Sequence, residues 1–331
     1  MKAILGIDVG SEGCQARLLR GAHEAEDLRF DNTASGFKTL RRYLKKRKLK
    51  TLHVCMEATG RYYEALAEFL YECGYAVSVV NPARIKAYAD SLLSRNKTDH
   101  LDAVLIADFC RTQDPPLWTP PAPAQRELQA LVRHLEDLQT DDQRQRNRLH
   151  ALRHAAHPAP MVLANVEQQI RLLQGQIQQV KRAIAHHLDQ HPDLKRDKQL
   201  LTSIPGIGEL TAGKLLAEFR CIRDFTDVRQ LVAFAGLNPR HHQSGKTARG
   251  PTPISKQGRA TIRAALFLPA VVAKTHAPAL QPLVARLQAR GLSKMEIVVA
   301  VMRKLLHFIF GVLKSGQPFD PHFLQTQAAV A

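Results

Sequence analysis

Four carboxylates in the first third of the chain have the residue types and positions of a metal site. Asp8 interrupts the apolar run AILGIDV, and Glu57 ends the run TLHVCME. Asp99 and Asp102 follow in TDHLDA, three residues apart, so that their side chains share one face if the segment is helical. Mg²⁺ prefers carboxylate and water oxygens together with substrate phosphate. If these acids converge at one edge of a sheet, they predict a Mg²⁺ site, and two such ions about 4 Å apart stabilise both the attacking and the leaving oxygen of a phosphodiester.

Three of the acids also have a simpler interpretation when each is taken alone. Thr98 is a candidate N-cap of a helix that begins at Asp99. Asp99 and Asp102 would then lie in the first turn, where the helix macrodipole stabilises acidic side chains. Glu57 is equally well explained as a solvated side chain at the end of a strand. A charge at Asp8, inside a strand, is costly unless a cation or hydrogen bonds compensate it. As a set in a basic chain, the acids favour the metal site.

The charge balance predicts a nucleic acid partner. The 331 residues include 47 Lys and Arg against 30 Asp and Glu, a formal net charge of +17. Such an excess indicates a polyanion held by phosphate neutralisation and counterion release. Aromatic residues make up only 6%, which favours contacts with the nucleic acid backbone over base stacking.

Several other classes of protein are disfavoured. The N-terminal apolar run before Asp8 is too short for a signal peptide, and no apolar segment approaches the ~18 to 20 residues that span a bilayer. The five cysteines are scattered and form no C-x-x-C pair, and the histidine pairs have no Cys or carboxylate at ligand spacing, which argues against disulfides and zinc. We therefore expect a cytoplasmic protein with no membrane partner.

Residues 1–112 predict a mixed α/β domain. Apolar runs of strand length come first in a meander and then alternate with segments of helical period, which is the order of a mixed sheet. The strands are expected at 3–9, 14–20, 26–30, 51–57 and 75–82, and the helices at 37–48, at 61–74 and after Pro82.

A proline-rich linker at 113–125 separates this domain from a predicted helical hairpin at 126–196. Leucines recur at 3–4 spacing, and after a break at 157–160 the spacing resumes, with mostly Gln, Arg, Lys and His between the apolar positions. A structural spacer and an oligomer interface explain this coiled-coil-like pattern equally well. The seam positions are Leu128, Leu131, Leu135, Leu138, Val162, Val166, Ile170, Leu173, Ile177, Val180, Ile184 and Leu188.

Residues 197–331 predict a mostly α domain. In LLTSIPGIGELTAGKLLAEF, Gly206 and Gly208 allow a tight turn that exposes backbone N–H groups beside a helix start, a geometry suited to phosphates. The segment resembles the helix-hairpin-helix element of DNA-binding proteins, with Lys214 as a phosphate contact. A plain connection between two helices is the alternative. The final apolar helix, MEIVVAVMRKLLHFIFGVLKSG, is expected in the core.

Ser244 lies in a glycine-containing loop that is rich in cations. The serine is explained either by turn chemistry or as a nucleophile for a phosphodiester, with the cations stabilising charge on phosphorus. His241 and His242 lie close in sequence, but the residues alone define no catalytic triad. The cations expected to contact nucleic acid are Arg240, Lys246, Arg249, Lys256, Arg259 and Arg263.

The motifs GIDVGS, CMEATGRYYEALAEFLYECGYAVSVVNP and RNKTDHLDA resemble the N-terminal domain of the IS110 family of transposases. The resemblance implies an RNase H-like (RuvC-like) fold and an acidic tetrad at Asp8, Glu57, Asp99 and Asp102. GLNPRHHQSG and ISKQGRATIR resemble the C-terminal transposase domain of the same family, whose nucleophilic serine matches Ser244.

The resemblance implies a DNA recombinase of a bacterial insertion sequence, associated with the nucleoid. It would act on donor and target double-stranded DNA chosen by a structured non-coding guide RNA. Since two duplexes have up to four strands to break, we expect a homo-oligomer, a dimer or a tetramer on DNA. Two alternatives remain: a RuvC-like, metal-dependent endonuclease of branched DNA, and a non-catalytic scaffold that binds nucleic acid.

Overall fold

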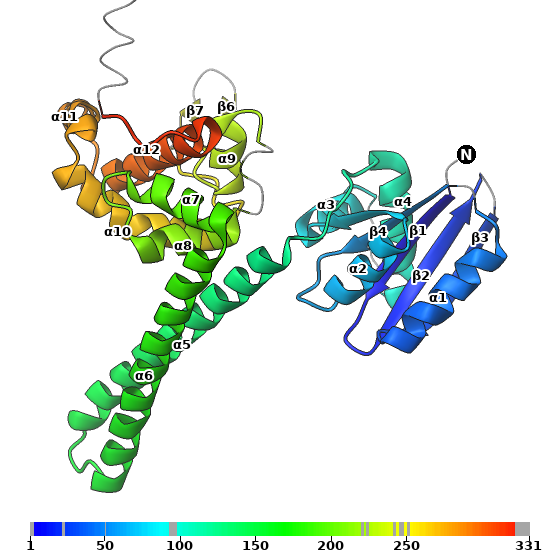
Figure 1. The fold of residues 1–331 in the computed structure, drawn as a ribbon, viewed down its shortest axis with the longest axis horizontal. Coiled ribbons are helices and arrows are strands. Elements are labelled where there is room, and N and C mark those ends of the chain that lie inside the picture. The colour runs from blue at the N-terminus through cyan, green and yellow to red at the C-terminus, as the bar shows by residue number, and fades with distance from the viewer. Residues whose placement is uncertain are drawn as a thin grey trace, which may run out of the picture. The chain divides into compact units, whose positions relative to one another are not determined.

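The computed structural model describes residues 3–21, 24–49, 51–92, 98–219, 222, 225–240, 243–244, 248–249 and 252–321, and of residues 99, 243–244 and 248–249 it describes the backbone alone. The chain divides into two compact units, Met1–Pro120 and Pro121–Ala331 (Figure 1). The first unit contains two hydrophobic cores and the second unit contains one. The finer division at 112, 125 and 196 stays a prediction.

The first unit contains the mixed sheet predicted from the sequence. Its five strands lie in the order β3-β2-β1-β4-β5. The first three strands pair antiparallel, whereas β4 and β5 continue parallel to β1. This order makes β1 the central strand. The strands are β1 Ala3–Val9, β2 Gly13–Arg20, β3 Glu24–Asp31, β4 Leu52–Glu57 and β5 Ala76–Val80.

Helices cover both faces of this sheet. Leu5 and Ile7 of the central strand belong to a core with residues of α1 and α2, whereas Ile4 and Cys55 belong to a separate core with residues of α3 and α4. Alternate residues of a strand point to opposite faces, so the two cores lie on opposite sides of the sheet. The helices are α1 Ala34–Lys46, α2 Glu64–Glu72, α3 Pro82–Ser91 and α4 Asp99–Gln113.

The start of α4 is fixed by the capping residue that the sequence predicts. Thr98 has an extended backbone, and its side chain accepts a hydrogen bond from the Leu101 N–H at 3.3 Å. This bond satisfies one of the free N–H groups in the first helical turn. Asp99 is therefore the first helical residue, as predicted.

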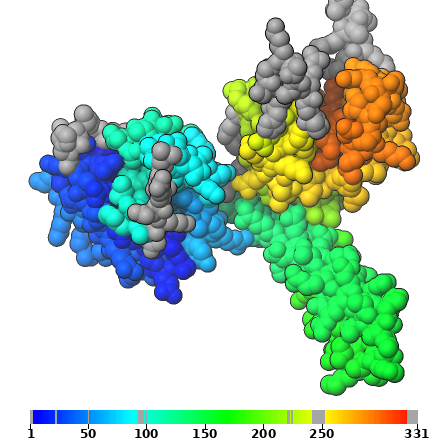
Figure 2. All heavy atoms as spheres, turned by 180° about the vertical axis from the view of Figure 1, so that it is seen from behind, coloured from blue at the N-terminus to red at the C-terminus, as the bar shows by residue number. Residues whose placement is uncertain are grey.

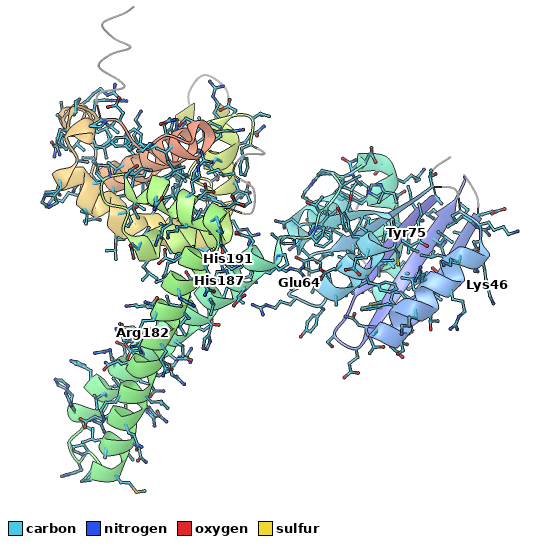
Figure 3. The ribbon with its side chains drawn as sticks, in the orientation of Figure 1. Lys46, Glu64, Tyr75, Arg182, His187 and His191 are labelled. Atoms are coloured by element: carbon cyan, nitrogen blue, oxygen red, sulfur yellow. The ribbon has the colours of Figure 1, made fainter. Side chains whose placement is uncertain are left out.

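The second unit begins with the predicted helical hairpin, whose two helices of 31 residues are α5 Pro123–Arg153 and α6 Pro160–Gln190. Its closed end extends beyond the rest of this unit (Figures 1 and 2). At the base, buried His187 donates a hydrogen bond to the Ala124 carbonyl at 2.8 Å and lies beside His191 (Figure 3). Glu127 lies 3.7 Å from the other ring nitrogen of His187, a carboxylate neighbour that sequence spacing did not predict. The description of the hairpin as a coiled coil stays a prediction.

The remaining helices form one core with the base of the hairpin. Val301, Leu305 and Ile309 of α12 are fully buried, which confirms the predicted central position of the last helix. None of the helices within the described ranges is long and apolar enough to cross a membrane. The elements are α7 Pro192–Thr202, α8 Glu209–Glu218, α9 Val228–Phe234, β6 Gln243–Ser244, β7 Ala248–Arg249, α10 Ala260–His276, the 3₁₀ turn Pro278–Leu280, α11 Gln281–Ala289 and α12 Lys294–Ser315.

Candidate active site and nucleic-acid contacts

Asp8 and Glu57 lie at the carboxyl ends of two neighbouring parallel strands. β1 and β4 pair with Ile7 opposite Met56. The next residue on each strand is therefore Asp8 and Glu57, in adjacent positions and on the same face of the sheet. Both side chains are half-buried, and the Thr59 hydroxyl donates a hydrogen bond to Glu57 Oε1 at 3.3 Å.

Helix α4 brings the other two acids to this face. Gly6 points to the same side of β1 as Asp8, and a Cβ built on Gly6 would lie 2.6 Å from the Ala103 carbonyl oxygen. The backbone of α4 therefore rests directly on β1. Asp102 immediately precedes Ala103 and is half-buried. Asp99 starts the same helix one turn earlier, and its side chain lies outside the described part of the structure.

The donor set fits the chemistry of Mg²⁺. Asp8, Glu57 and Asp102 offer hard carboxylate oxygens from β1, from β4 and from the helix that packs on β1. Among the side chains that the structure describes, which do not include that of Asp99, no three His, Cys, Asp or Glu form a group that could hold a metal ion. The metal tetrad stays a prediction.

Asn32 connects the two loops that follow the strand acids. Its side-chain amide donates hydrogen bonds to the Gly10 carbonyl at 2.9 Å and to the Tyr62 carbonyl at 3.1 Å. Gly10 lies two residues after Asp8, and Tyr62 five residues after Glu57. The amide thus holds together the chain segments that leave β1 and β4. Sequence reasoning missed this residue, because a single Asn before a helix gives no signal of distant partners.

The turn between α7 and α8 is packed against α10. Gly206 has φ +90°, and a Cβ there would lie 2.7 Å from the Pro269 carbonyl oxygen. Gly208 is the residue before α8 and is exposed to solvent, so the first N–H groups of α8 lie next to a solvent-exposed residue. Lys214 faces α5, with Nζ 3.6 Å from Glu136 Oε1. A turn between two helices is present, and a helix-hairpin-helix that binds DNA stays a prediction.

Ser244 lies in a short β-hairpin. Its backbone pairs with Ala248, and Gln243 pairs with Arg249. The side chains of Ser244 and Arg249 lie outside the part of the chain that the structure describes. The same holds for the whole of His241, His242 and Lys246. The proposed role of Ser244 therefore rests on the family resemblance.

Of the cations near this hairpin in sequence, two are exposed to solvent and two contact other parts of the protein. Arg240 and Lys256 are exposed. Arg263 donates to the Ala235 carbonyl at 2.9 Å, and Arg259 Nη1 lies 3.5 Å from the buried Glu218 carboxylate. Arg263 and Arg259 therefore stabilise the packing of the domain, whatever further contacts they make.

Known proteins resemble the chain over nearly its whole length. Residues 5–158 match a family model described as a transposase of the IS110 type, and residues 198–285 match the "Transposase IS116/IS110/IS902 family". Pilin gene-inverting proteins of Moraxella bovis and Moraxella lacunata are 35% and 34% identical to the chain over 96% of its length and 98% of theirs. The chain belongs to the IS110 family of transposases. This confirms the family prediction.

This IS110-family transposase has further relatives at lower similarity. The transposase for insertion sequence element IS1328 of Yersinia enterocolitica is 26% identical over 63% of this chain and 67% of the relative. Among solved structures, T. thermophilus RuvC in complex with a Holliday junction substrate aligns with 36% of this chain and 100% of its own, at a TM-score of 0.28 and 12% identity. As a transposase, the protein is an enzyme of DNA recombination.

Proposed function

We propose that this transposase cuts and rejoins DNA through a covalent phosphoserine intermediate at Ser244, assisted by Mg²⁺ held by Asp8, Glu57, Asp99 and Asp102. The observation that supports the metal site best is the register of β1 and β4. It places Asp8 and Glu57 side by side on the face of the sheet where α4, the helix of Asp99 and Asp102, packs.

In the proposed step, the Ser244 hydroxyl oxygen forms a bond to the scissile phosphorus while the bond from phosphorus to the DNA 3′-oxygen breaks. The serine loses its proton, and the leaving 3′-oxygen gains one, so the step yields a phosphoserine ester and a free 3′-hydroxyl. Attack of a 3′-hydroxyl from the other duplex reverses these bond changes and releases the serine. The phosphoserine ester retains the free energy of the phosphodiester bond that was broken, so that rejoining needs no ATP.

The chain's own residues would have separate tasks in this step. The four acids hold the ion, and the bound Mg²⁺ supplies Lewis-acid stabilisation of negative charge on the phosphate and leaving oxygen. Exposed cations such as Arg240 and Lys256 hold the DNA backbone through charge-assisted contacts. Asn32 positions the loops beside the acids through its two hydrogen bonds.

The proposed partners are donor and target double-stranded DNA and a structured non-coding guide RNA. The RNA follows from the family resemblance, and the net charge of +17 suits a protein that holds RNA and two duplexes together. A homo-oligomer, a dimer or a tetramer on DNA, would provide one serine and one metal site for each strand that is broken.

A composite active site follows from this proposal, in which the acids of one subunit act with the serine of another. Mixed dimers with Asp102→Asn in one subunit and Ser244→Ala in the other test it, compared with dimers that carry both changes in the same subunit. We expect the two arrangements to differ in activity. Equal activity in both arrangements would argue against a composite site.

The decisive experiment for Ser244 is an adduct assay. Purified protein is incubated with Mg²⁺, RNA transcribed from the flank of its element, and labelled donor and target DNA. After denaturation, we expect DNA shifted by the mass of one protein chain in the wild type and in the exposed control Ser91→Ala, and none in Ser244→Ala. Asp8→Asn should also abolish the adduct while DNA binding persists.

The other outcomes identify the alternatives. Cleavage without an adduct, unchanged by Ser244→Ala, would identify a metal-dependent nuclease that uses water. Binding without cleavage, independent of Mg²⁺ and of Asp8→Asn, would identify a scaffold.

A further inference from the structure

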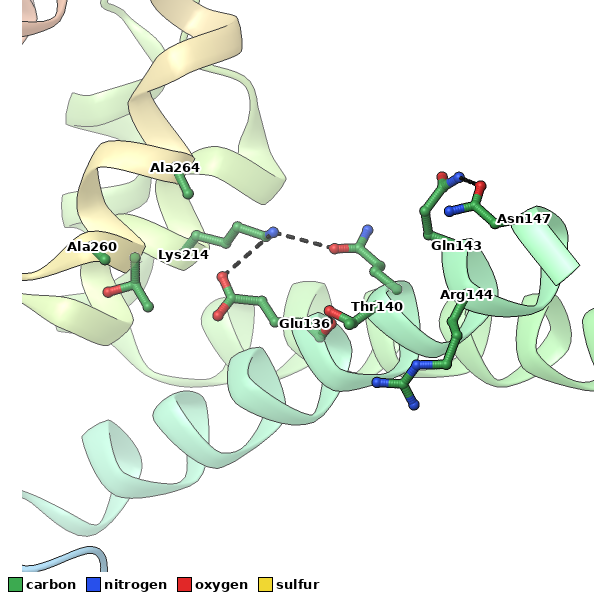
Figure 4. Close-up of a pocket in the computed structure, with 10 residues that line it drawn as sticks. Glu136, Thr140, Gln143, Arg144, Asn147, Lys214, Ala260 and Ala264 are labelled. Carbon is green, nitrogen blue, oxygen red and sulfur yellow. Dashed lines mark hydrogen bonds and ion pairs between the residues drawn. The ribbon is translucent and has the colours of Figure 1, made fainter.

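A groove of about 760 Å³ lies within the second unit, between α5, α8 and the first turns of α10 (Figure 4). It takes most of its lining from the polar face of α5, and Lys214 and the start of α10 form the remainder. The residues of the groove are Glu136, Gln139, Thr140, Gln143, Arg144, Asn147, Lys214, Ala260, Thr261 and Ala264.

Three side-chain amides form a ladder along this groove. Gln139, Gln143 and Asn147 recur every four residues on α5, so they project from one face of the helix. Gln143 donates a hydrogen bond to Asn147 at 2.8 Å (Figure 4), which aligns the two amides and leaves each with further donors and acceptors. A second hollow, on the α6 side of α5, also includes Gln139 and Gln143. These amides thus lie at a part of the hairpin that is hollowed on two sides.

The inner end of the groove is polar but nearly neutral. Lys214 Nζ lies 3.6 Å from Glu136 Oε1 and 3.4 Å from Gln139 Oε1, so its charge is already paired (Figure 4). Thr261, in the first turn of α10, has a buried hydroxyl with no hydrogen-bond partner among the described residues. A buried hydroxyl normally has a hydrogen-bond partner, so an ordered water or a polar group of a ligand would satisfy this oxygen.

We propose that this groove binds an unstacked nucleic acid strand by hydrogen bonds from the amides to base edges. Asn and Gln amides match the paired donor and acceptor of adenine, and Glu accepts from cytosine. Successive amides are about 6 Å apart along the helix, farther than the ~3.4 Å between stacked bases of one strand. The spacing therefore suits bases that are splayed apart, the usual form in which single-stranded RNA is read.

The proposal rests on the proposed function only in taking nucleic acid as the partner, and it is independent of Ser244. Both the guide RNA and an opened DNA strand present such base edges, so the test must separate them. Because Gln143 and Asn147 are exposed on a helix, their replacement by Ala should leave the fold intact.

The test compares two double variants. The groove variant carries Gln143→Ala and Asn147→Ala, and the matched control carries Gln168→Ala and Gln169→Ala at exposed amides of α6. Full-length proteins are titrated with labelled 20-nucleotide random-sequence RNA, single-stranded DNA and duplex DNA at several salt concentrations. We expect the groove variant to bind a single strand about tenfold more weakly with an unchanged salt slope, because amides displace no counterions. The control should stay within about twofold of the wild type.

A photo-crosslinking residue at Thr140, which lines the groove, locates the strand. Crosslinks to RNA identify the guide as the source, and crosslinks to single-stranded DNA identify an opened duplex. Unchanged affinity of the double variant for all three probes, or no crosslink with any, would overturn the proposal. Since neither readout needs cleavage, a wild type that crosslinks here but forms no adduct would refute only the serine chemistry.

Discussion

Gly6 lies directly beneath Ala107, and a Cβ on Gly6 would come within 2.3 Å of the Ala107 backbone nitrogen. Only glycine lets α4 approach β1 this closely. Asp8 follows two residues later on the strand, and Asp102 precedes Ala107 by five residues on the helix. The contact therefore sets how near the helix acids lie to the strand acid.

Gly6→Ala should damage both stability and the proposed metal site, because the methyl group must push α4 off the sheet. Overpacking of this kind costs about 1–3 kcal/mol of unfolding free energy, and the shift of Asp102 should raise the Mg²⁺ concentration needed for cleavage. Urea unfolding and Mg²⁺ titration measure the two effects. Gly13→Ala is the control, since its nearest neighbour, the Phe30 carbonyl oxygen, would be 3.8 Å away. Equal behaviour of the two variants would contradict the proposed role of the close contact.

Asn32→Ala should lower cleavage more than stability. The substitution removes both hydrogen bonds that join the loops after β1 and β4, at Gly10 and Tyr62. Asn32 is half-buried and its two hydrogen bonds are solvent-exposed, so we expect a loss of about 1 kcal/mol in unfolding free energy. Misplacement of Asp8 and Glu57 should reduce cleavage at least tenfold, with a higher Mg²⁺ requirement. Replacement of the exposed amide Gln113 by Ala is the control, and a cleavage defect that saturating Mg²⁺ leaves unchanged would speak against a positioning role.

The sequence predicts the parts of this fold that depend on local pattern. Apolar runs of strand length predicted β1 and β4, and the capping residue Thr98 predicted the first turn of α4, because both signals are encoded within a few residues. The sequence placed Asp8 inside one predicted strand and Glu57 at the end of another, and the metal site depended on their convergence. Their adjacent positions on β1 and β4 needed the structure.

Contacts between distant segments were beyond sequence reasoning. From the sequence, Arg259 and Arg263 are expected only as cations that contact nucleic acid. In the structure, Arg259 lies beside the Glu218 carboxylate and Arg263 donates a hydrogen bond to the Ala235 carbonyl. In the sequence, Gln139 and Gln143 look like solvent-exposed side chains of a helical hairpin. They line a groove because α8 and α10 pack beside α5. No local pattern encodes which surface another helix will approach.

Glu26 should make the first unit sensitive to acid. Hydrogen bonds from Arg47 and Tyr43 lower the pKa of Glu26 from 4.5 to about 2. A carboxyl whose pKa falls on folding adds stability at pH values above its unfolded pKa, and this stability is lost as the pH falls toward the folded pKa. We expect Glu26→Gln to be less stable than the wild type at pH 7 and the difference to shrink between about pH 4.5 and 2.

Urea unfolding of the wild type and Glu26→Gln at pH 7, 4.5 and 3 measures this difference. Glu24→Gln is the matched control, since the Glu24 side chain is 70% exposed and its carboxylate lies 3.5 Å from Arg20. A stability gap for Glu26→Gln that stays constant with pH would show that packing, rather than the charge, is what the substitution removes.

Arg259 and Arg240 lie in the same basic segment, but their substitution should give different results. Arg259 is paired with Glu218, whose side chain is only 5% exposed, and its guanidinium lies 5.8 Å from the centre of the Phe234 ring. Arg259→Gln leaves a buried carboxylate without its cation, and because Arg259 itself is partly exposed we expect a loss of about 1–3 kcal/mol in unfolding free energy.

Arg240→Gln should instead weaken nucleic acid binding without loss of stability. Its side chain is exposed, so the unfolding free energy should change by less than about 0.5 kcal/mol. Loss of one phosphate contact should reduce the slope of log affinity against log salt by about 1. Urea unfolding and DNA titration at several salt concentrations measure both variants. If Arg259→Gln changes the salt slope and leaves stability intact, its main partner is phosphate and the contact with Glu218 contributes little.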